Sequence, residues 1–350
     1  MDEQLLPDLL RLRGSVVAAS DEFFAAKENL VKHNAPVFVP ETYDAKGQVY
    51  DGWETRRRRG AGGTLPDRKA RDWVIVRLGV PGVVRSIVVD TAFFTGNYPQ
   101  ACSADACSVS GYPSLSELSA DDAPGTGSWQ EIVPRALLTG DARHAFKVSS
   151  GRRFTHVRLN IFPDGGVARL HVHGEVVPDP AMLEGLTIDL AALENGADIV
   201  ARSDQFYSSP RNVISPGLSR VMGEGWETRR RRKPGYEWLV VRLAGRGVID
   251  LAEIDTSWYR GNQPHSASLQ TMDAADPAAG SLADERAWHD LLPKVTLLPD
   301  TPHRFRVQGA PATHVRLNIF PDGGVARLRL YGSLTDDGLS ALRRHWDETG

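Results

Sequence analysis

The chain has 350 residues, of which 41% are hydrophobic and 24% charged, and its formal net charge is −3. This length exceeds the usual size of one domain and fits two units that each bury a core. The slightly acidic balance argues against a nucleic-acid-binding protein, and no apolar run reaches the roughly 18 residues of a membrane span.

The N-terminal sequence MDEQLLPDLLRLR starts with acids and lacks both the basic segment and the long apolar segment of a secretory signal. The two cysteines, Cys102 and Cys107, lie in the first half of the chain only. This usage suits reduced thiols better than a disulfide framework or a metal site. We therefore expect a cytoplasmic protein.

Long blocks of sequence occur twice. GWETRRRR at 52–59 recurs at 225–232, and THVRLNIFPDGGVARL at 155–170 recurs at 313–328. Two further blocks, which begin at Asp90 and Trp129 and again at Asp255 and Trp288, match in the same order. Such self-similarity predicts an internal duplication.

The repeats place one domain at 1–178, called copy one here, and another at 186–350, called copy two. The largest insertion is GAGGTLPDRKARD (60–72), which takes the place of KPGYE (233–237). Its glycines and proline indicate a surface loop.

In chain order, most blocks read as β-strands. WVIVRL (73–78) and WLVVRL (238–243) are nearly continuous apolar runs, as expected of buried strands. THVRLNIF alternates, so that one face packs in the core and the other faces out. PDGG (163–166) is a turn sequence, and we expect the following run to return as a hairpin partner.

The final segment, LTDDGLSALRRHWDE, has the apolar spacing of a capping helix. Many short strands, few helices and no alternation of strands with helices favour an all-β protein in which each copy is an antiparallel sandwich or jelly roll.

The arginine motif is the feature that packing explains least. If the motif is extended, Glu54, Arg56 and Arg58 share one face, as do Glu227, Arg229 and Arg231 in copy two. Guanidinium groups bind carboxylates with two parallel hydrogen bonds, so a carboxylate ligand is one interpretation. The other is an arginine ladder that pairs with acidic residues where the two copies meet.

Asparagines mark two further candidate positions in each copy. Asn97 and Asn262 lie in turns that follow a predicted buried strand, and Asn160 and Asn318 precede the PDGG turn. An asparagine side chain both donates and accepts hydrogen bonds, so it can read a urea-like group. Without their neighbours, Asn97 and Asn262 are ordinary turn residues, and an aspartate before two glycines, as at Asp164 and Asp322, is usually one too.

Histidines differ between the copies. His171 and His173 form an HxH pair, but copy two has Arg329 and Tyr331 there, and two histidines without a matched third ligand make a poor metal site. His265 occurs only in copy two, where copy one has Gln100, and is an acid/base candidate or a surface histidine. No P-loop, GxSxG, HExxH or paired CxxC motif is present.

Several of these strings together resemble the allantoicase family. They are SDEFFAAKENL (20–30), PVFVPETYD (36–44), DGWETRRRR (51–59), DTAFFTGNYP (90–99) and the repeated THVRLNIFPDGGVARL. The resemblance spans nearly the whole chain and implies two galactose-binding-like jelly-roll domains. It also implies hydrolysis of allantoate to ureidoglycolate and urea in purine breakdown, by a homo-oligomer. No cofactor is predicted, and a divalent metal is left open.

Allantoate, a small carboxylate with two ureido groups on one carbon, fits the candidate residues. Arginines 56, 58, 229 and 231 are the predicted carboxylate clamp, and asparagines 97, 160, 262 and 318 are the predicted ureido readers. Glu54, Glu227 and His265 are the predicted catalytic acid/base groups. The rival interpretations are a non-catalytic tandem jelly roll that binds a sugar or small carboxylate, and an amidohydrolase that releases ammonia.

Overall fold

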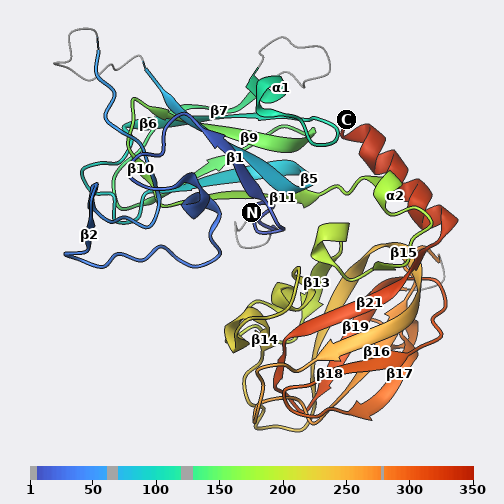
Figure 1. Cartoon of the computed structure of the whole chain (residues 1–350). Coiled ribbons are helices and arrows are strands. Elements are labelled where there is room, and N and C mark those ends of the chain that lie inside the picture. The colour runs from blue at the N-terminus through green and yellow to red at the C-terminus, as the bar shows by residue number, and fades with distance from the viewer. Residues whose placement is uncertain (1–5, 61–69, 120–128, 277–279) are drawn as a thin grey trace. The chain divides into compact units, whose positions relative to one another are not determined.

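The computed structural model describes residues 6–60, 70–119, 129–276 and 280–350 (Figure 1). It divides into two compact units, of which one comprises residues 1–177 with 349–350 and the other residues 178–348. The predicted insertion at 60–72 lies largely outside the described residues. Among the described helices, none combines the length and apolar character needed to cross a membrane.

Copy one consists of short strands around one long strand. Its elements are β1 (Ser15–Ala19), η2 (Lys27–Val31), β2 (Tyr43–Asp44), β3 (Gly47–Gln48), β4 (Trp53–Glu54), β5 (Asp72–Asp90), β6 (Ala101–Cys107), α1 (Leu115–Ser119), β7 (Gln130–Leu137), β8 (Arg143–Lys147), β9 (Arg153–Phe162), β10 (Gly166–Val167) and β11 (Arg169–Val176).

Copy two repeats most of this strand order and ends in a helix. After η3 (Pro180–Met182), which lies between the copies, its elements are β12 (Ile188–Asp189), η4 (Leu193–Asn195), β13 (Asp198–Arg202), η5 (Pro210–Ile214), η6 (Met222–Glu224), β14 (Trp226–Glu227), β15 (Glu237–Asp255), β16 (Ser266–Met272), η7 (Glu285–Ala287), β17 (His289–Thr296), β18 (Pro302–Arg306), β19 (Ala312–Phe320), β20 (Gly324–Val325), β21 (Arg327–Leu334) and α2 (Asp336–Glu348).

The long strands β5 and β15 organise the two copies. The first part of β5 pairs with β1 and β9, and its last part pairs with β8 and β11. β15 does the same with β13 and β19 and then with β18 and β21. Each long strand therefore belongs to both layers of a sandwich. The predicted all-β class with two jelly-roll units is confirmed, as is the C-terminal helix, α2.

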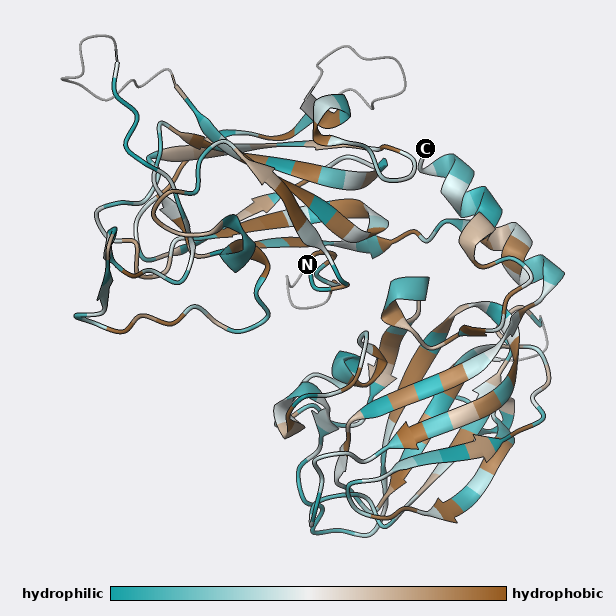
Figure 2. Ribbon diagram, viewed as in Figure 1, coloured by the Kyte–Doolittle hydropathy of each residue, from teal (hydrophilic) through white to brown (hydrophobic). Residues whose placement is uncertain are grey.

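Alternating apolar residues form the core of each sandwich (Figure 2). In β9, Val157, Leu159 and Ile161 are at most 1% exposed, as the alternation predicted. The expectation that the opposite face of β9 points outwards is wrong, because His156 and Asn160 are also only 1% exposed.

A segment near α1 covers this second face. Leu118 and Cys107 pack together there, with Trp129 against them. Polar residues of the face pair with one another, since Arg158 lies 3.0 Å from Asp105 and stacks over the Trp129 ring.

The PDGG turn does not produce a hairpin. β9 pairs with β5 and β6, whereas β11 pairs with a different part of β5. The predicted hairpin is therefore wrong, because the turn carries the chain from one layer of the sandwich to the other. On the way, β10 pairs with β4, so that Gly166 lies opposite Glu54.

Glycine is required where this turn meets the loop that carries Asn97. Gly165 has φ 138°, and a Cβ there would lie 2.7 Å from the Asn97 carbonyl oxygen. Gly323 has φ 131°, and its Cβ would lie 2.5 Å from the Asn262 carbonyl oxygen. Those carbonyls accept hydrogen bonds from the next glycine N–H in each copy, at 2.8 Å. The close approach positions each asparagine beside the start of β10 or β20.

We expect Gly165→Ala and Gly323→Ala each to destabilise their own unit by about 1–3 kcal/mol, the usual cost of a strained backbone residue. Urea unfolding monitored by circular dichroism measures this. Gly151→Ala is the matched control, because its Cβ meets nothing within 4 Å. Unfolding midpoints equal to that of the control would show that the close approach is unimportant.

Candidate active site

The first and third motif arginines of each copy pair with acidic residues. The Arg56 guanidinium contacts the Asp21 carboxylate at 2.8 Å and that of Arg58 contacts Asp72 at 2.6 Å. In copy two, Arg229 pairs with Asp204 and Arg231 with Glu237. These pairs lie within each copy, so the proposed clamp arginines already have carboxylate partners from their own unit.

Arg57 occupies a different position from its neighbours. Its Nη1 donates to Asp164 Oδ1 at 2.8 Å, and its Nη2 donates to the Gly96 carbonyl oxygen at 3.3 Å. Asp164 also accepts a 2.6 Å hydrogen bond from the Arg58 backbone N–H. The Asp164 side chain is 1% exposed while that of Arg57 is 51% exposed. Arg57 therefore covers a buried carboxylate and presents its outer edge to solvent.

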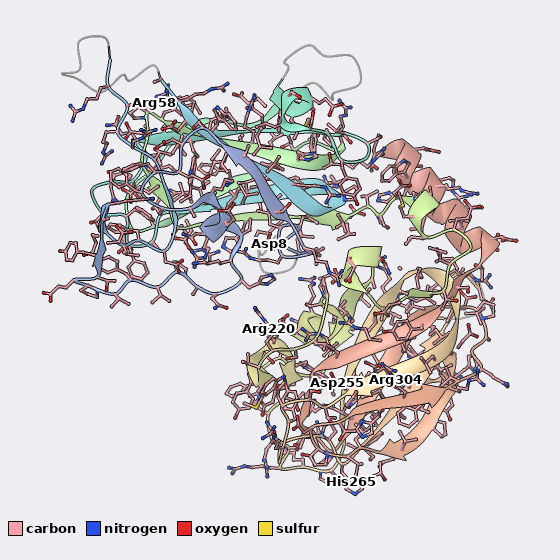
Figure 3. The ribbon with its side chains drawn as sticks, in the orientation of Figure 1. Asp8, Arg58, Arg220, Asp255, His265 and Arg304 are labelled. Atoms are coloured by element: carbon pink, nitrogen blue, oxygen red, sulfur yellow. The ribbon has the colours of Figure 1, made fainter. Side chains whose placement is uncertain are left out.

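A cavity of about 350 Å³ lies at this position. It is lined by Arg57, Arg58, Arg59, Gly96, Tyr98, Gln100, Pro163 and Asp164. Its volume is that of a small-molecule site. Three arginines against one aspartate make the cavity cationic, so it suits a small anion. Figure 3 shows Arg58 among the side chains of copy one.

Glu54 and Asn97, predicted from separate motifs, are brought together. Asn97 Nδ2 donates to Glu54 Oε1 at 2.8 Å, and Asn262 Nδ2 donates to Glu227 Oε1 at 2.7 Å. Burial raises the pKa of Glu54 above its usual value, although the Asn97 hydrogen bond and the Arg57 charge oppose this effect. Glu54 and Asn97 adjoin Arg57 but do not line the cavity.

The same region of copy two is more open. Pro321 is exposed and Asp322 half-buried, whereas Pro163 and Asp164 are buried. Asp322 keeps the hydrogen bond from the Arg231 backbone N–H, at 2.7 Å. Arg230, the counterpart of Arg57, is exposed, and we find no hydrogen bond of its side chain to any described residue.

His265 lies at one edge of the copy-two sandwich, where Figure 3 shows its side chain pointing outwards. Its backbone N–H donates to the Phe320 carbonyl oxygen at 2.9 Å, and the side chain is exposed. Its counterpart in copy one, Gln100, lines the cavity. His265 therefore occupies the position in copy two that corresponds to a cavity-lining residue of copy one.

Asn160 and Asn318 are not brought into this site. Asn160 Nδ2 donates to Ser103 Oγ at 3.2 Å and to Asp105 Oδ2 at 2.9 Å, beneath the segment that covers β9. Asn318 makes the matching bonds to Ser268 and Gln270. Both side chains lie on the second face of their sheet and are buried there. The alternation in the sequence does not show that this face is covered.

Arg57, Asp164 and Gln100 are the site residues that sequence reasoning missed. Asp164 precedes two glycines and was interpreted as a turn residue, and Arg57 lies on the opposite face from the predicted clamp. The available signal was the recurrence of Asp322 and Arg230 in copy two. An aspartate and an arginine that both recur in the two copies are candidates for an ion pair, even when they lie far apart in the sequence.

Burial of Glu54 has a consequence for stability. The pKa of Glu54 in the folded protein lies above the ordinary 4.5. Ionisation of Glu54 therefore lowers the stability of the fold as the pH rises above 4.5, and this cost vanishes at lower pH. We expect Glu54→Gln, which keeps the acceptor for Asn97, to gain stability relative to the wild type between pH 4 and pH 7. Thermal unfolding at both pH values tests this, with exposed Glu131→Gln as control. A difference that does not change with pH would contradict the assignment.

The chain is similar to known proteins over most of its length. A family model described as the allantoicase repeat matches residues 8–177 and 188–335. A relative from Streptomyces coelicolor named probable allantoicase is 49% identical over 97% of this chain and 88% of its own length. The allantoicase of Dictyostelium discoideum is 40% identical over 95% of this chain and 87% of its own.

Solved structures agree with the sequence matches. The crystal structure of allantoicase from Saccharomyces cerevisiae has a TM-score of 0.72 and 33% identity, covering 93% of this chain and 92% of that one. Another structure of allantoicase has a TM-score of 0.73 and 34% identity, covering 93% of both chains. The chain therefore belongs to the allantoicase family.

Proposed function

We propose that this chain hydrolyses allantoate to ureidoglycolate and urea. Family membership supports the reaction, and the observation that carries it to particular residues is the Glu54–Asn97 pair beside Arg57 and the cationic cavity. Copy two repeats the Glu–Asn pair with Glu227 and Asn262. Together these groups supply charge recognition, amide recognition and proton transfer.

The carboxylate of the substrate is held by an arginine. We assign this role to Arg57 and Arg230, because Arg57 lines the cavity and Arg230 has the corresponding place in the motif. Arg56, Arg58, Arg229 and Arg231 hold the motif in position through their acidic partners and add positive charge to the site. A guanidinium can bind a carboxylate with two N–H groups, which fixes orientation as well as charge.

The ureido group is read by Asn97 or Asn262. The Nδ2 of each donates to the neighbouring glutamate, and the side-chain carbonyl oxygen can accept a hydrogen bond from a ureido N–H. Asn160 and Asn318 support the sheet beneath the site, where they hydrogen-bond to Ser103 and Ser268.

Cleavage requires a proton to be given and another to be taken. The C–N bond to the departing urea breaks as its nitrogen gains a proton, and the oxygen of a water molecule bonds to the same carbon and loses one. Urea leaves before water adds, or water displaces it directly. Glu54, Glu227 and His265 are the proposed acid/base groups, and burial brings the pKa of Glu54 closer to neutrality.

We further propose a homo-oligomer, as the family resemblance implies, and a cytoplasmic location, as the N-terminal sequence and the cysteine usage predict. Cys102 and Cys107 are buried free thiols. Free thiols are usual in the reducing environment of the cytoplasm, so they support this location. Burial raises the pKa of both to about 12, so they remain protonated.

Purified protein incubated with allantoate should release urea and not ammonia. Turnover no higher than the uncatalysed rate, with or without added divalent metal, would instead support the tandem binding protein. Ammonia as the product would indicate an amidohydrolase.

We expect the double variant Arg57→Ala/Arg230→Ala to lower kcat/KM by roughly 10²–10³-fold, the usual cost of removing a group that stabilises developing charge. Steady-state urea release measures this, and each single variant reports on its own copy. Arg343→Ala, which breaks an exposed pair with Glu184, is the control. Near-normal kcat/KM in the double variant would refute the clamp.

We expect His265→Gln, which gives copy two the residue of copy one, to lower kcat by about 10²-fold or more if the histidine transfers a proton. Gln100→His should change kcat much less. Measuring kcat from pH 5 to pH 9 separates proton transfer from substrate binding. Equal and small effects of the two substitutions would make His265 a surface residue.

A further inference from the structure

Copy one contains a cluster of metal-ligating side chains outside the proposed active site. Asp8, His171 and His173 each place one ligand atom within 4.8 Å of the other two. His171 Nδ1 lies 2.8 Å from Asp8 Oδ2, and His173 Nδ1 lies 3.3 Å from the Leu6 carbonyl oxygen. All three ligating residues are half-buried. Figure 3 shows Asp8 close to the N-terminal end of the described chain.

The arrangement follows from strand geometry. His171 and His173 are two residues apart in β11, so their side chains leave the same face, and their rings are parallel with centroids 5.9 Å apart. Asp8 belongs to a segment that runs antiparallel beside β11 and forms a bridge with His173. Asp8 Oδ1 accepts hydrogen bonds from the Leu10 and Val172 N–H groups, which fixes the carboxylate against the strand.

Copy two shows what the position requires. Asp189 Oδ1 accepts from the Ala191 and Leu330 N–H groups, the same two bonds that Asp8 makes. There the residue that replaces His171 is Arg329, whose Nη1 lies 3.6 Å from Asp189 Oδ2. The shared aspartate is therefore a structural feature of both copies, whereas the two imidazoles are an addition in copy one.

We propose that Asp8, His171 and His173 bind one divalent transition metal ion of the zinc class. Two imidazoles and one carboxylate are the ligand set that Zn²⁺, Co²⁺ and Ni²⁺ accept, and water supplies the remaining ligand. The sequence expectation of no site rested on the lack of a third ligand, which Asp8 supplies from 163 residues away.

Metal binding changes the position of a proton. His171 Nδ1 and Asp8 Oδ2 lie within hydrogen-bonding distance of each other, and coordination through Nδ1 places the ring proton of a neutral imidazole on Nε2. The bound ion ties the segment around Asp8 to β11. Arg11 Nε lies 3.6 Å from Asp8 Oδ2, and its positive charge opposes the ion and limits its affinity.

The test uses untagged full-length protein that has been stripped with a chelator. Titration with Zn²⁺ by calorimetry should show one ion per chain. Co²⁺ should give the d–d absorption of a low-coordinate site with imidazole ligands. Neither readout depends on catalysis, so the result stands whether or not allantoate is the substrate.

The variants His171→Arg and His173→Tyr introduce the residues of copy two, and each should weaken Zn²⁺ binding at least about tenfold. His289→Gln, which removes an exposed histidine of copy two, is the matched control and should bind as the wild type does. Asp8→Asn provides a second test if an arginine at position 171 prevents folding.

The proposal is overturned if the wild type binds no Zn²⁺ at micromolar concentration. Unchanged affinity in both histidine variants, or an equal loss in His289→Gln, would likewise assign any bound metal to another place on the chain.

Discussion

The carboxylates of Asp164 and Asp322 hold the arginine motif to the rest of each sandwich. Each accepts a hydrogen bond from the backbone N–H of the third motif arginine, at 2.6 Å in copy one and 2.7 Å in copy two. This bond fixes the path of the motif after β4 or β14, together with the hydrogen bond that Asp21 or Asp204 accepts from the backbone N–H of the first motif arginine. The aspartate itself is placed by the turn between two layers of the sandwich, so the site depends on where the layers are connected.

Charge decides how the arginines of copy one are used. Consecutive guanidinium groups repel one another unless carboxylates lie between them. Three separate segments of the chain supply these carboxylates, from Asp21, Asp72 and Asp164. Arg56 pairs with Asp21, and Arg58 pairs with Asp72. These two arginines are the ones that share a face if the motif is extended. Arg57 lies on the opposite face, bonds to Asp164 and lines the cavity together with Arg58 and Arg59. The pairing that stabilises the motif thus also presents cationic groups to a small anion.

The two copies share a scaffold and differ in the residues around it. Both keep the Glu–Asn pair, the aspartate of the turn and the positive-φ glycine next to it. They differ at Gln100 and His265 and at the HxH pair. At Asp8 and Asp189, identical backbone hydrogen bonds are combined with imidazoles in one copy and with a guanidinium in the other. A duplicated fold can therefore keep its supports while its surface chemistry diverges.

The sequence by itself determined the duplication, the all-β class and the pairing of like motifs, because these are recorded as exact repeats and as local periodicity. It also identified Glu54 with Asn97 and Glu227 with Asn262 as candidates, although not as neighbours. Only the tertiary structure decided which residues meet. Alternation along β9 cannot show that a segment near Leu118 covers its second face, and so Asn160 was assigned to the site although it is buried elsewhere.

The same limit explains Arg57 and Asp8. Local pattern assigns residues to faces of a strand, but the partner of a face can come from a segment more than a hundred residues away, as Asp164 does for Arg57 and Asp8 for His171. Such contacts are set by how the layers close on each other. The fold class could therefore be predicted from periodicity, whereas the arrangement of the site required the packed sandwich.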